Sequence, residues 1–232
     1  MDRRYAIYAA PPTGAPLARW GAAWLGRDAE SGAVPAPPPV PGWSEADLAR
    51  VTAAPRHYGL HATLKPPFRL AAGADEGKLL AAAEAVAASL PPPSPTRLRL
   101  TAIGGFLALV PDGPAPALHA LADACVERLD PFRAPPDAAE LARRRSERLS
   151  AREREHLSRW GYPYVFDTFR FHITLTGSLE AVERDALHRA LTPLVAPVIA
   201  APLRLDDIAL FVQENGAPFR LARRFPLRRG GR

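Results

Sequence analysis

The sequence contains the same four-residue pattern, His-x-Thr-Leu, in two segments that are otherwise rich in strand-forming residues. The first copy is His61-Ala62-Thr63-Leu64 and the second is His172-Ile173-Thr174-Leu175. Side chains of an extended strand alternate between two faces, so each copy places an imidazole and a hydroxyl on the same face. Apolar neighbours at the intervening positions can anchor each strand in a core. The pattern therefore predicts two similar strands, each with one chemically active face.

The segments that follow the two motifs are also alike, which indicates an internal duplication. Each motif precedes a helical pattern and then a strand pattern, at 98–106 and at 203–211, which match at Leu, Arg, Leu, Ile and Phe. Two such units predict two lobes related by a pseudo-twofold axis, and such symmetry would bring both imidazoles to one cleft, where ligands commonly bind.

Apolar periodicity and turn residues predict the remaining elements. Pro66 and Pro67 are expected to end the first motif strand, and Gly104-Gly105 to form a bulge or a tight link. Ser44 and Ser178 are predicted to begin helices, and Asn215-Gly216 to close a hairpin. The predicted strands are 4–9, 98–110, 203–213 and 218–226, and the predicted helices are 17–25, 75–90, 115–129, 137–159 and 178–195.

Length and composition favour one globular domain over residues 1–232, made of two lobes, with a charged helical insertion near 137–159. The single Cys125 excludes a disulfide scaffold and fits a reducing cytoplasm. The sequence has no apolar run near the roughly 18 residues of a membrane span, and its start lacks the apolar core of a signal peptide. We expect a cytoplasmic monomer that does not bind membranes.

The net charge of +6 is compatible with RNA or with a phosphorylated small molecule. However, 28 of the 30 basic residues are Arg, and only Lys65 and Lys78 are Lys. This bias, with 27 Pro residues, indicates a global compositional trend, so the charge alone makes RNA the less favoured partner. Lys65 is more informative because a rare Lys follows the first motif directly.

Two facing imidazoles suit acid–base chemistry at a phosphate ester. A neutral imidazole takes a proton from water, and a protonated one gives a proton to the leaving oxygen. The two hydroxyls can donate to the non-bridging phosphate oxygens. This chemistry needs no metal and no cofactor. A zinc site is the chemical alternative, because His57 and His61 are four residues apart, but no Glu lies between them and the following residues favour a strand.

At these residues the chain resembles the two-histidine (2H) phosphoesterase superfamily, which includes 2′-5′ RNA ligase-like proteins. The resemblance rests on the paired His-x-Thr motifs and implies metal-independent phosphodiester chemistry. It also implies a bilobal α+β fold, with pseudo-twofold duplicated antiparallel sheets, flanking helices and a central cleft lined by the two His-x-Thr strands. The segments 4–8, 20–25, 58–68, 103–111 and 160–177 look like the subgroup associated with bacterial phosphonate-degradation (carbon–phosphorus lyase) genes. That association implies a phosphorylated ribose cyclic phosphate as substrate, such as 5-phosphoribosyl 1,2-cyclic phosphate, which would open to ribose 1,5-bisphosphate.

The resemblance implies that His61, Thr63, His172 and Thr174 are the catalytic or phosphate-holding residues. Position along the chain adds Tyr58, Lys65, Tyr164 and Arg170 as candidate substrate-binding residues. A second phosphate would need a basic anchor, and the charged segment that begins at Asp137 is the expected supplier.

Two other functions stay open on the sequence. One is an RNA-end enzyme that acts on 2′,3′-cyclic or 2′-5′ linked termini, and the other is a non-catalytic RNA-binding module that keeps the cleft. The sequence does not assign the base and acid roles between His61 and His172, because a pseudo-symmetric pair allows either order.

Overall fold

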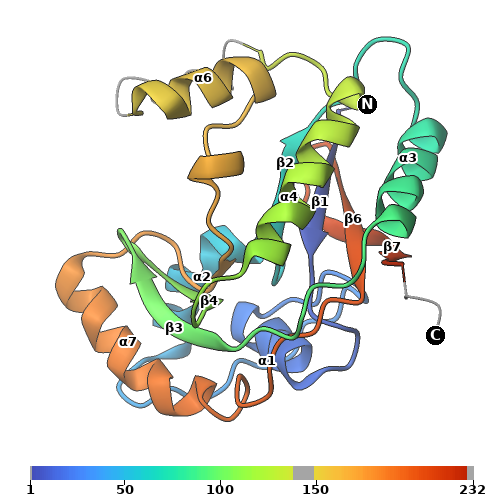
Figure 1. The fold of residues 1–232 in the computed structure, drawn as a ribbon. Coiled ribbons are helices and arrows are strands. Elements are labelled where there is room, and N and C mark those ends of the chain that lie inside the picture. Colours follow the sequence, from blue (N-terminus) through green and yellow to red (C-terminus); the bar gives the residue numbers. More distant parts are fainter. Residues whose placement is uncertain (1, 138–148, 229–232) are drawn as a thin grey trace.

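The computed structural model describes residues 2–137 and 149–228 and is built on one seven-stranded antiparallel sheet (Figure 1). The strand order is β3-β4-β5-β2-β1-β6-β7. The strands are β1 (Arg3–Ala9), β2 (Ala62–Phe68), β3 (Leu98–Ile103), β4 (Phe106–Pro111), β5 (Ile173–Thr174), β6 (Asp207–Glu214) and β7 (Arg220–Pro226). The α-helices are α1 (Pro16–Leu25), α2 (Glu45–Arg56), α3 (Glu76–Ser89), α4 (Pro116–Leu129), α6 (Ala151–Trp160) and α7 (Ala181–Val195).

The two motif strands, β2 and β5, are neighbours in the middle of this sheet, and one residue pair, Ala62 with Ile173, joins them. The β3–β4 hairpin follows the first motif in the sequence but extends the sheet beyond β5. The β6–β7 hairpin follows the second motif but extends the sheet beyond β1 and β2. The α+β class is therefore confirmed. The structure has one sheet rather than two, and the two halves of this sheet meet at the residue pair of Ala62 with Ile173.

Helices fix the two halves of the sheet in place. The helices α3 and α4 pack against each other, with α4 over β2 and α3 beside β7, while α7 packs on β3 and β4 (Figure 1). The helix α1 contacts α2, and its buried Trp24 donates a hydrogen bond from Nε1 to the carbonyl oxygen of Leu175 at 2.8 Å. This bond ties the second motif to α1. No helix in the described ranges is long and apolar enough to cross a bilayer.

Several local signals in the sequence work as expected. Ser44 and Asp47 form a capping box at the start of α2. Asn215 and Gly216, both with positive φ, close the β6–β7 hairpin. Gly104 and Gly105 link β3 tightly to β4, so the predicted strand over 98–110 is a hairpin.

Two predicted helices begin elsewhere. The helix α7 begins at Ala181, with Glu180 rather than Ser178 at its N-cap. The charged segment is not one helix from 137 to 159, because α6 begins at Ala151. There Ser150 adopts an extended conformation and forms a capping box with Glu153, which defines a new helix start. Residues 138–148 of that prediction lie outside the described residues.

The strand β2 continues through Pro66 and Pro67 instead of ending at them. Proline lacks the N–H that a ladder needs and is tolerated where a strand has an open edge. After Ala62 the described residues supply no partner on the β5 side of β2, so this edge is open. The same opening gives ligands access to the face of β2.

A β-bulge in β2 reverses the direction of Lys65. Ile7 pairs with Lys65 and Tyr8 pairs with Thr63, so Leu64 is an extra residue that breaks the alternation of faces. The Lys65 side chain is buried against α4, where Nζ donates to the carbonyl oxygen of Val126 and to Asp130 Oδ1, both at 3.2 Å. The predicted role of Lys65 in substrate binding is therefore not supported, because its ammonium lies on the core face of β2.

Lys65→Met tests this burial through stability at two pH values. Burial lowers the pKa of Lys65 to about 8 from 10.5. Since the unfolded chain binds more protons between these values, the folded state gains stability as pH rises through them. We expect wild type to gain about 2 kcal/mol relative to Lys65→Met between pH 7 and pH 9.5. Urea unfolding at both pH values measures this, and a pH-independent difference would contradict it.

Candidate functional site

The register of the two motif strands places both histidines and both threonines together. Ala62 pairs with Ile173 in antiparallel register, and both side chains are buried in the core. Residues on either side of the pair therefore point to the opposite face, with His61 across from Thr174 and Thr63 across from His172. Each imidazole of one motif faces the hydroxyl of the other. The repeated pattern predicted an imidazole and a hydroxyl of each copy on one face, and the register of β2 and β5 adds how the two copies face each other.

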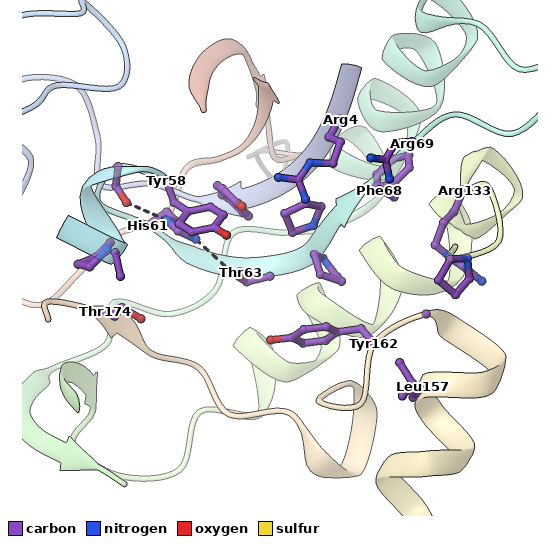
Figure 2. A pocket seen from close by; sticks show the side chains of 18 of the residues that line it. Arg4, Tyr58, His61, Thr63, Phe68, Arg69, Arg133, Leu157, Tyr162 and Thr174 are labelled. Atoms are coloured by element: carbon purple, nitrogen blue, oxygen red, sulfur yellow. Dashed lines mark hydrogen bonds between the residues drawn. The ribbon is translucent and has the colours of Figure 1, made fainter. Parts of the chain in front are cut away.

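These four residues lie at one end of an open pocket of about 590 Å³. The pocket extends along β2 from His61 and Thr63 to Phe68 and Arg69 (Figure 2). Its other walls come from β1, from the end of α2, from residues 133–137, and from the segment around Tyr162. The volume suits a small organic ligand.

His61 is held in one orientation by three contacts. Its Nδ1 donates a hydrogen bond to the carbonyl oxygen of Gly59 at 2.8 Å, which makes Nε2 the accepting nitrogen of the neutral ring. Nε2 lies 3.3 Å from Thr63 Oγ1. The ring of Tyr8 stacks on the imidazole with 3.7 Å between centroids. Gly59 has a φ of +80°, and a Cβ there would lie 2.6 Å from Cβ of Ala29, so this carbonyl position requires glycine.

His172 repeats the backbone contact. Its Nδ1 donates to the carbonyl oxygen of Arg170 at 2.8 Å, again two residues upstream, and Nε2 is left for the pocket. Its ring lies beside Phe106, with 5.7 Å between centroids. The two imidazoles therefore present equivalent nitrogens, but only His61 is covered by a stacked ring.

Burial lowers the pKa of both imidazoles. It lowers the pKa of His61 to about 4, with a smaller contribution from the nearby His172, while the hydrogen bond to Gly59 acts in the opposite direction. Burial also lowers the pKa of His172 below 6.5, and its bond to Arg170 opposes this. Each of these two rings is therefore harder to protonate than an unperturbed histidine.

The three threonines that line the pocket use their hydroxyls differently. The Thr63 hydroxyl contacts His61 Nε2. The Thr174 hydroxyl makes no hydrogen bond to any described residue, so it can donate to a ligand. Thr176 also lines the pocket, but its Oγ1 accepts from Leu107 N at 3.0 Å and donates to the Gly177 carbonyl at 2.9 Å. Thr176 therefore serves the connection between β4 and the second motif.

The residues added from sequence position have mixed outcomes. Tyr58 lines the pocket, where its ring stacks on Phe219 at 5.4 Å between centroids. Tyr164 and Arg170 are exposed and do not line the pocket, and Arg170 contributes its carbonyl rather than its guanidinium. Lys65 lies on the opposite face of β2, as described above. Of the four, the structure brings only the Tyr58 side chain to the site.

Sequence reasoning missed several residues that line the pocket. Tyr162, the ring neighbour of Tyr164, faces β2 across the pocket (Figure 2). Three arginines, Arg4, Arg69 and Arg133, gather at the end away from Thr174 (Figure 2). Arg4 and Tyr8 are four residues apart on one face of the first strand, so side-chain alternation was the available signal for them. Arg133 had none.

None of the described arginines in the charged segment, residues 137–159, lines the pocket. Arg152 pairs with Asp167 and Glu155, and neither Arg154 nor Arg159 lines the pocket. From α6 only Leu157 reaches it. The described His, Cys, Asp and Glu residues form no group of three or more that could hold a metal ion.

Tyr8→Ala tests whether the stacked ring suppresses protonation of His61. Without the ring, water reaches the imidazole, so we expect the pKa of His61 to rise from about 4 toward 6.5. Tyr8→Phe is the matched control, because it keeps the stack and should leave the pKa low. Titration of the imidazole resonances by NMR measures both, and equal pKa values in the two variants would contradict the role of the ring.

Two proteins with the same name match almost the whole chain. Both are called ribose 1,5-bisphosphate phosphokinase PhnN. The one from Janthinobacterium sp. (strain Marseille) is 39% identical over 228 residues, which cover 96% of this chain and 50% of that protein. The one from Laribacter hongkongensis (strain HLHK9) is 41% identical over 221 residues, with 95% and 51% covered. The chain thus spans about half the length of these relatives.

Solved structures and a family model also match. E. coli LigT, solved with 3′-AMP, has a TM-score of 0.49 and 15% identity, with 99% of this chain and 100% of that chain covered. A crystal structure of a phosphoesterase has a TM-score of 0.46 and 16% identity, with 98% and 100% covered. The family model that is described as a protein of unknown function (DUF1045) matches residues 63–220. This match spans both motifs except for His61, and the chain belongs to the DUF1045 family.

Proposed function

We propose that this protein is a phosphoesterase that opens a small, phosphorylated ribose cyclic phosphate without a metal ion. The observation that carries the proposal is the pairing of Ala62 with Ile173, which aims His61, Thr63, His172 and Thr174 into one pocket. Both histidines have Nδ1 bonded to a backbone carbonyl, so both offer Nε2 for proton transfer. This matches what a general base and a general acid on opposite sides of a phosphorus atom require.

The reaction adds water across one P–O bond of the ring. The neutral imidazole accepts a proton from water as the water oxygen bonds to phosphorus. The protonated imidazole gives its proton to the ribose oxygen as the P–O bond breaks. The product is a phosphate monoester with a free hydroxyl, and Thr63 and Thr174 donate hydrogen bonds to the non-bridging oxygens. The bound phosphate anion favours the charged form of one imidazole, which offsets the lowering of its pKa by burial.

The relatives suggest which sugar phosphate is bound. Their name states that they act on ribose 1,5-bisphosphate, and this chain corresponds to only half of their length. The present sequence has no Gly-x-x-x-x-Gly-Lys-Ser/Thr phosphate loop, so the kinase reaction is better assigned to the part of those proteins outside this match. Opening of 5-phosphoribosyl 1,2-cyclic phosphate at its 2-oxygen would yield the kinase substrate.

A 2′,3′-cyclic RNA end is the second candidate. Tyr58 and Tyr162 are half-buried and both line the pocket, and aromatic rings of this kind can stack on a base. The basic end of the pocket would suit either ligand. The ribose phosphate is favoured because the pocket has the volume of a small molecule and the relatives act on one.

Phosphorus NMR of the ring-opening reaction tests the proposal. We expect wild type to open 5-phosphoribosyl 1,2-cyclic phosphate faster than a nucleoside 2′,3′-cyclic phosphate, with no loss of rate in EDTA. His61→Ala and His172→Ala should each lower kcat about 100-fold to 10,000-fold, because each removes one partner in proton transfer.

His119→Ala is the matched control for these variants, since His119 lies on α4 outside the pocket and should leave the rate unchanged. Faster opening of the nucleoside ring would favour the RNA-end function. Absence of turnover on both rings, or rates that EDTA abolishes, would reject the proposed reaction.

The pH profile of kcat/KM follows from the lowered histidine pKa values. The base must be neutral, so activity appears as pH rises above its pKa, and the acid must be protonated, so activity falls as pH rises above its pKa. With His61 at about 4 and His172 lowered from 6.5, we expect a maximum between about 4 and 6.5. A maximum at or above pH 8 would contradict this electrostatic description of the site.

A further inference from the structure

The basic end of the pocket has one arginine that differs from the others. We infer that Arg4 is the anchor for the second phosphate of the substrate, the one that is not part of the ring. The inference rests on the proposed function and specifies it, because it limits the substrate to sugar phosphates with an anionic group at each end. It concerns a described residue, whereas residues 138–148 of the charged segment, the expected supplier of the anchor, lie outside the described residues.

Arg4 is fixed by a buried hydrogen-bond network. It lies opposite Gln213 in the pairing of β1 with β6, and its Nε donates to Gln213 Oε1 at 2.6 Å. Gln213 is 3% exposed. Its Nε2 lies 2.7 Å from both His57 Nε2 and the carbonyl oxygen of Ala217. Because the amide nitrogen donates to these two acceptors, the amide oxygen must face Arg4.

His57 completes this network as an acceptor. Burial, with the nearby Arg4 and Arg27 guanidiniums, lowers the pKa of His57 and so favours its neutral ring. Because the Gln213 amide nitrogen can only donate, His57 Nε2 is the accepting nitrogen of that ring. The buried Gln213 therefore has fixed partners for both its amide oxygen and its amide nitrogen, and it holds the Nε edge of the Arg4 guanidinium. A surface arginine does not need such support.

The remaining donors of Arg4 have no partner within the described chain. Nη1 and Nη2 make no hydrogen bond there, and the guanidinium forms no ion pair with a described carboxylate, although it lies 5.5 Å from the centroid of the Phe219 ring. By contrast, Arg133 bonds to both oxygens of Asp130, and Arg69 pairs with Asp2. A positioned guanidinium with two free donors suits the two oxygens of a phosphate.

The distance from Arg4 to the histidines suits a single sugar. Arg4 and Tyr8 are four residues apart on one face of β1, which corresponds to roughly 13 Å between their backbones. Tyr8 stacks on His61, and the Arg4 side chain extends from β1 toward Tyr58 and His61 (Figure 2). The side chain shortens the gap to the length of a pentose with a phosphate at each end.

Calorimetric binding of products tests the anchor independently of turnover. We expect wild type to bind ribose 1,5-bisphosphate more tightly than ribose 1-phosphate. Arg4→Gln should weaken binding of the bisphosphate roughly 10-fold to 100-fold and that of the monophosphate less than about 3-fold. Arg99→Gln is the charge-matched control, because Arg99 is exposed on β3 outside the pocket, and it should change neither affinity.

Each outcome decides the inference. Equal weakening of both ligands by Arg4→Gln, or no weakening, would overturn it, as would a wild type that does not prefer the bisphosphate. Arg4→Lys keeps the charge but loses the bond from Nε, and it should retain part of the preference for the bisphosphate. A retained preference would show that the effect of Arg4→Gln does not come from misfolding. If wild type opens neither cyclic phosphate but still prefers ribose 1,5-bisphosphate, the proposed reaction is rejected and the anchor is not.

Discussion

The backbone pair between Ala62 and Ile173 determines how the two halves of this protein meet. It is the only residue pair between β2 and β5 in the described chain, and both side chains are fully enclosed in the core. A longer ladder would close the open edge of β2 and fill the pocket with a strand. A sheet without this pair would separate the two motifs. One pair is enough to fix the register, and the register alone decides which side chains share a face.

The same constraint separates the two kinds of positive charge in the molecule. The bulge at Leu64 sends Lys65 to the core face, where Asp130 and a backbone carbonyl satisfy it. Arg4 stays on the pocket face, because β1 continues without such a reversal between Arg4 and the buried Ala6 in its pairing with β6. The pocket therefore contains guanidiniums, which remain charged at all relevant pH values, and no ammonium from β2.

The sequence could predict the parts of the site that depend on local pattern. Side-chain alternation places His61 with Thr63 and His172 with Thr174, and the duplicated segments indicate two related halves. It could not predict the position of Lys65, because a one-residue bulge depends on how Leu64 packs and leaves no motif. Arg133 and Tyr162 reach the pocket through loops whose paths depend on tertiary contacts. Their positions follow from the fold rather than from any local spacing.

The charges of the site bear on how an acid and a base could share it under the proposed function. Burial lowers the pKa of both imidazoles and so favours their neutral forms, which do not repel the arginines at the other end. An incoming phosphate adds negative charge beside the imidazoles and favours protonation of one of them. His61, covered by Tyr8, loses more hydration than His172, so His172 is the ring that the anion protonates more readily. Under the proposed function, this difference favours His61 as the base and His172 as the acid.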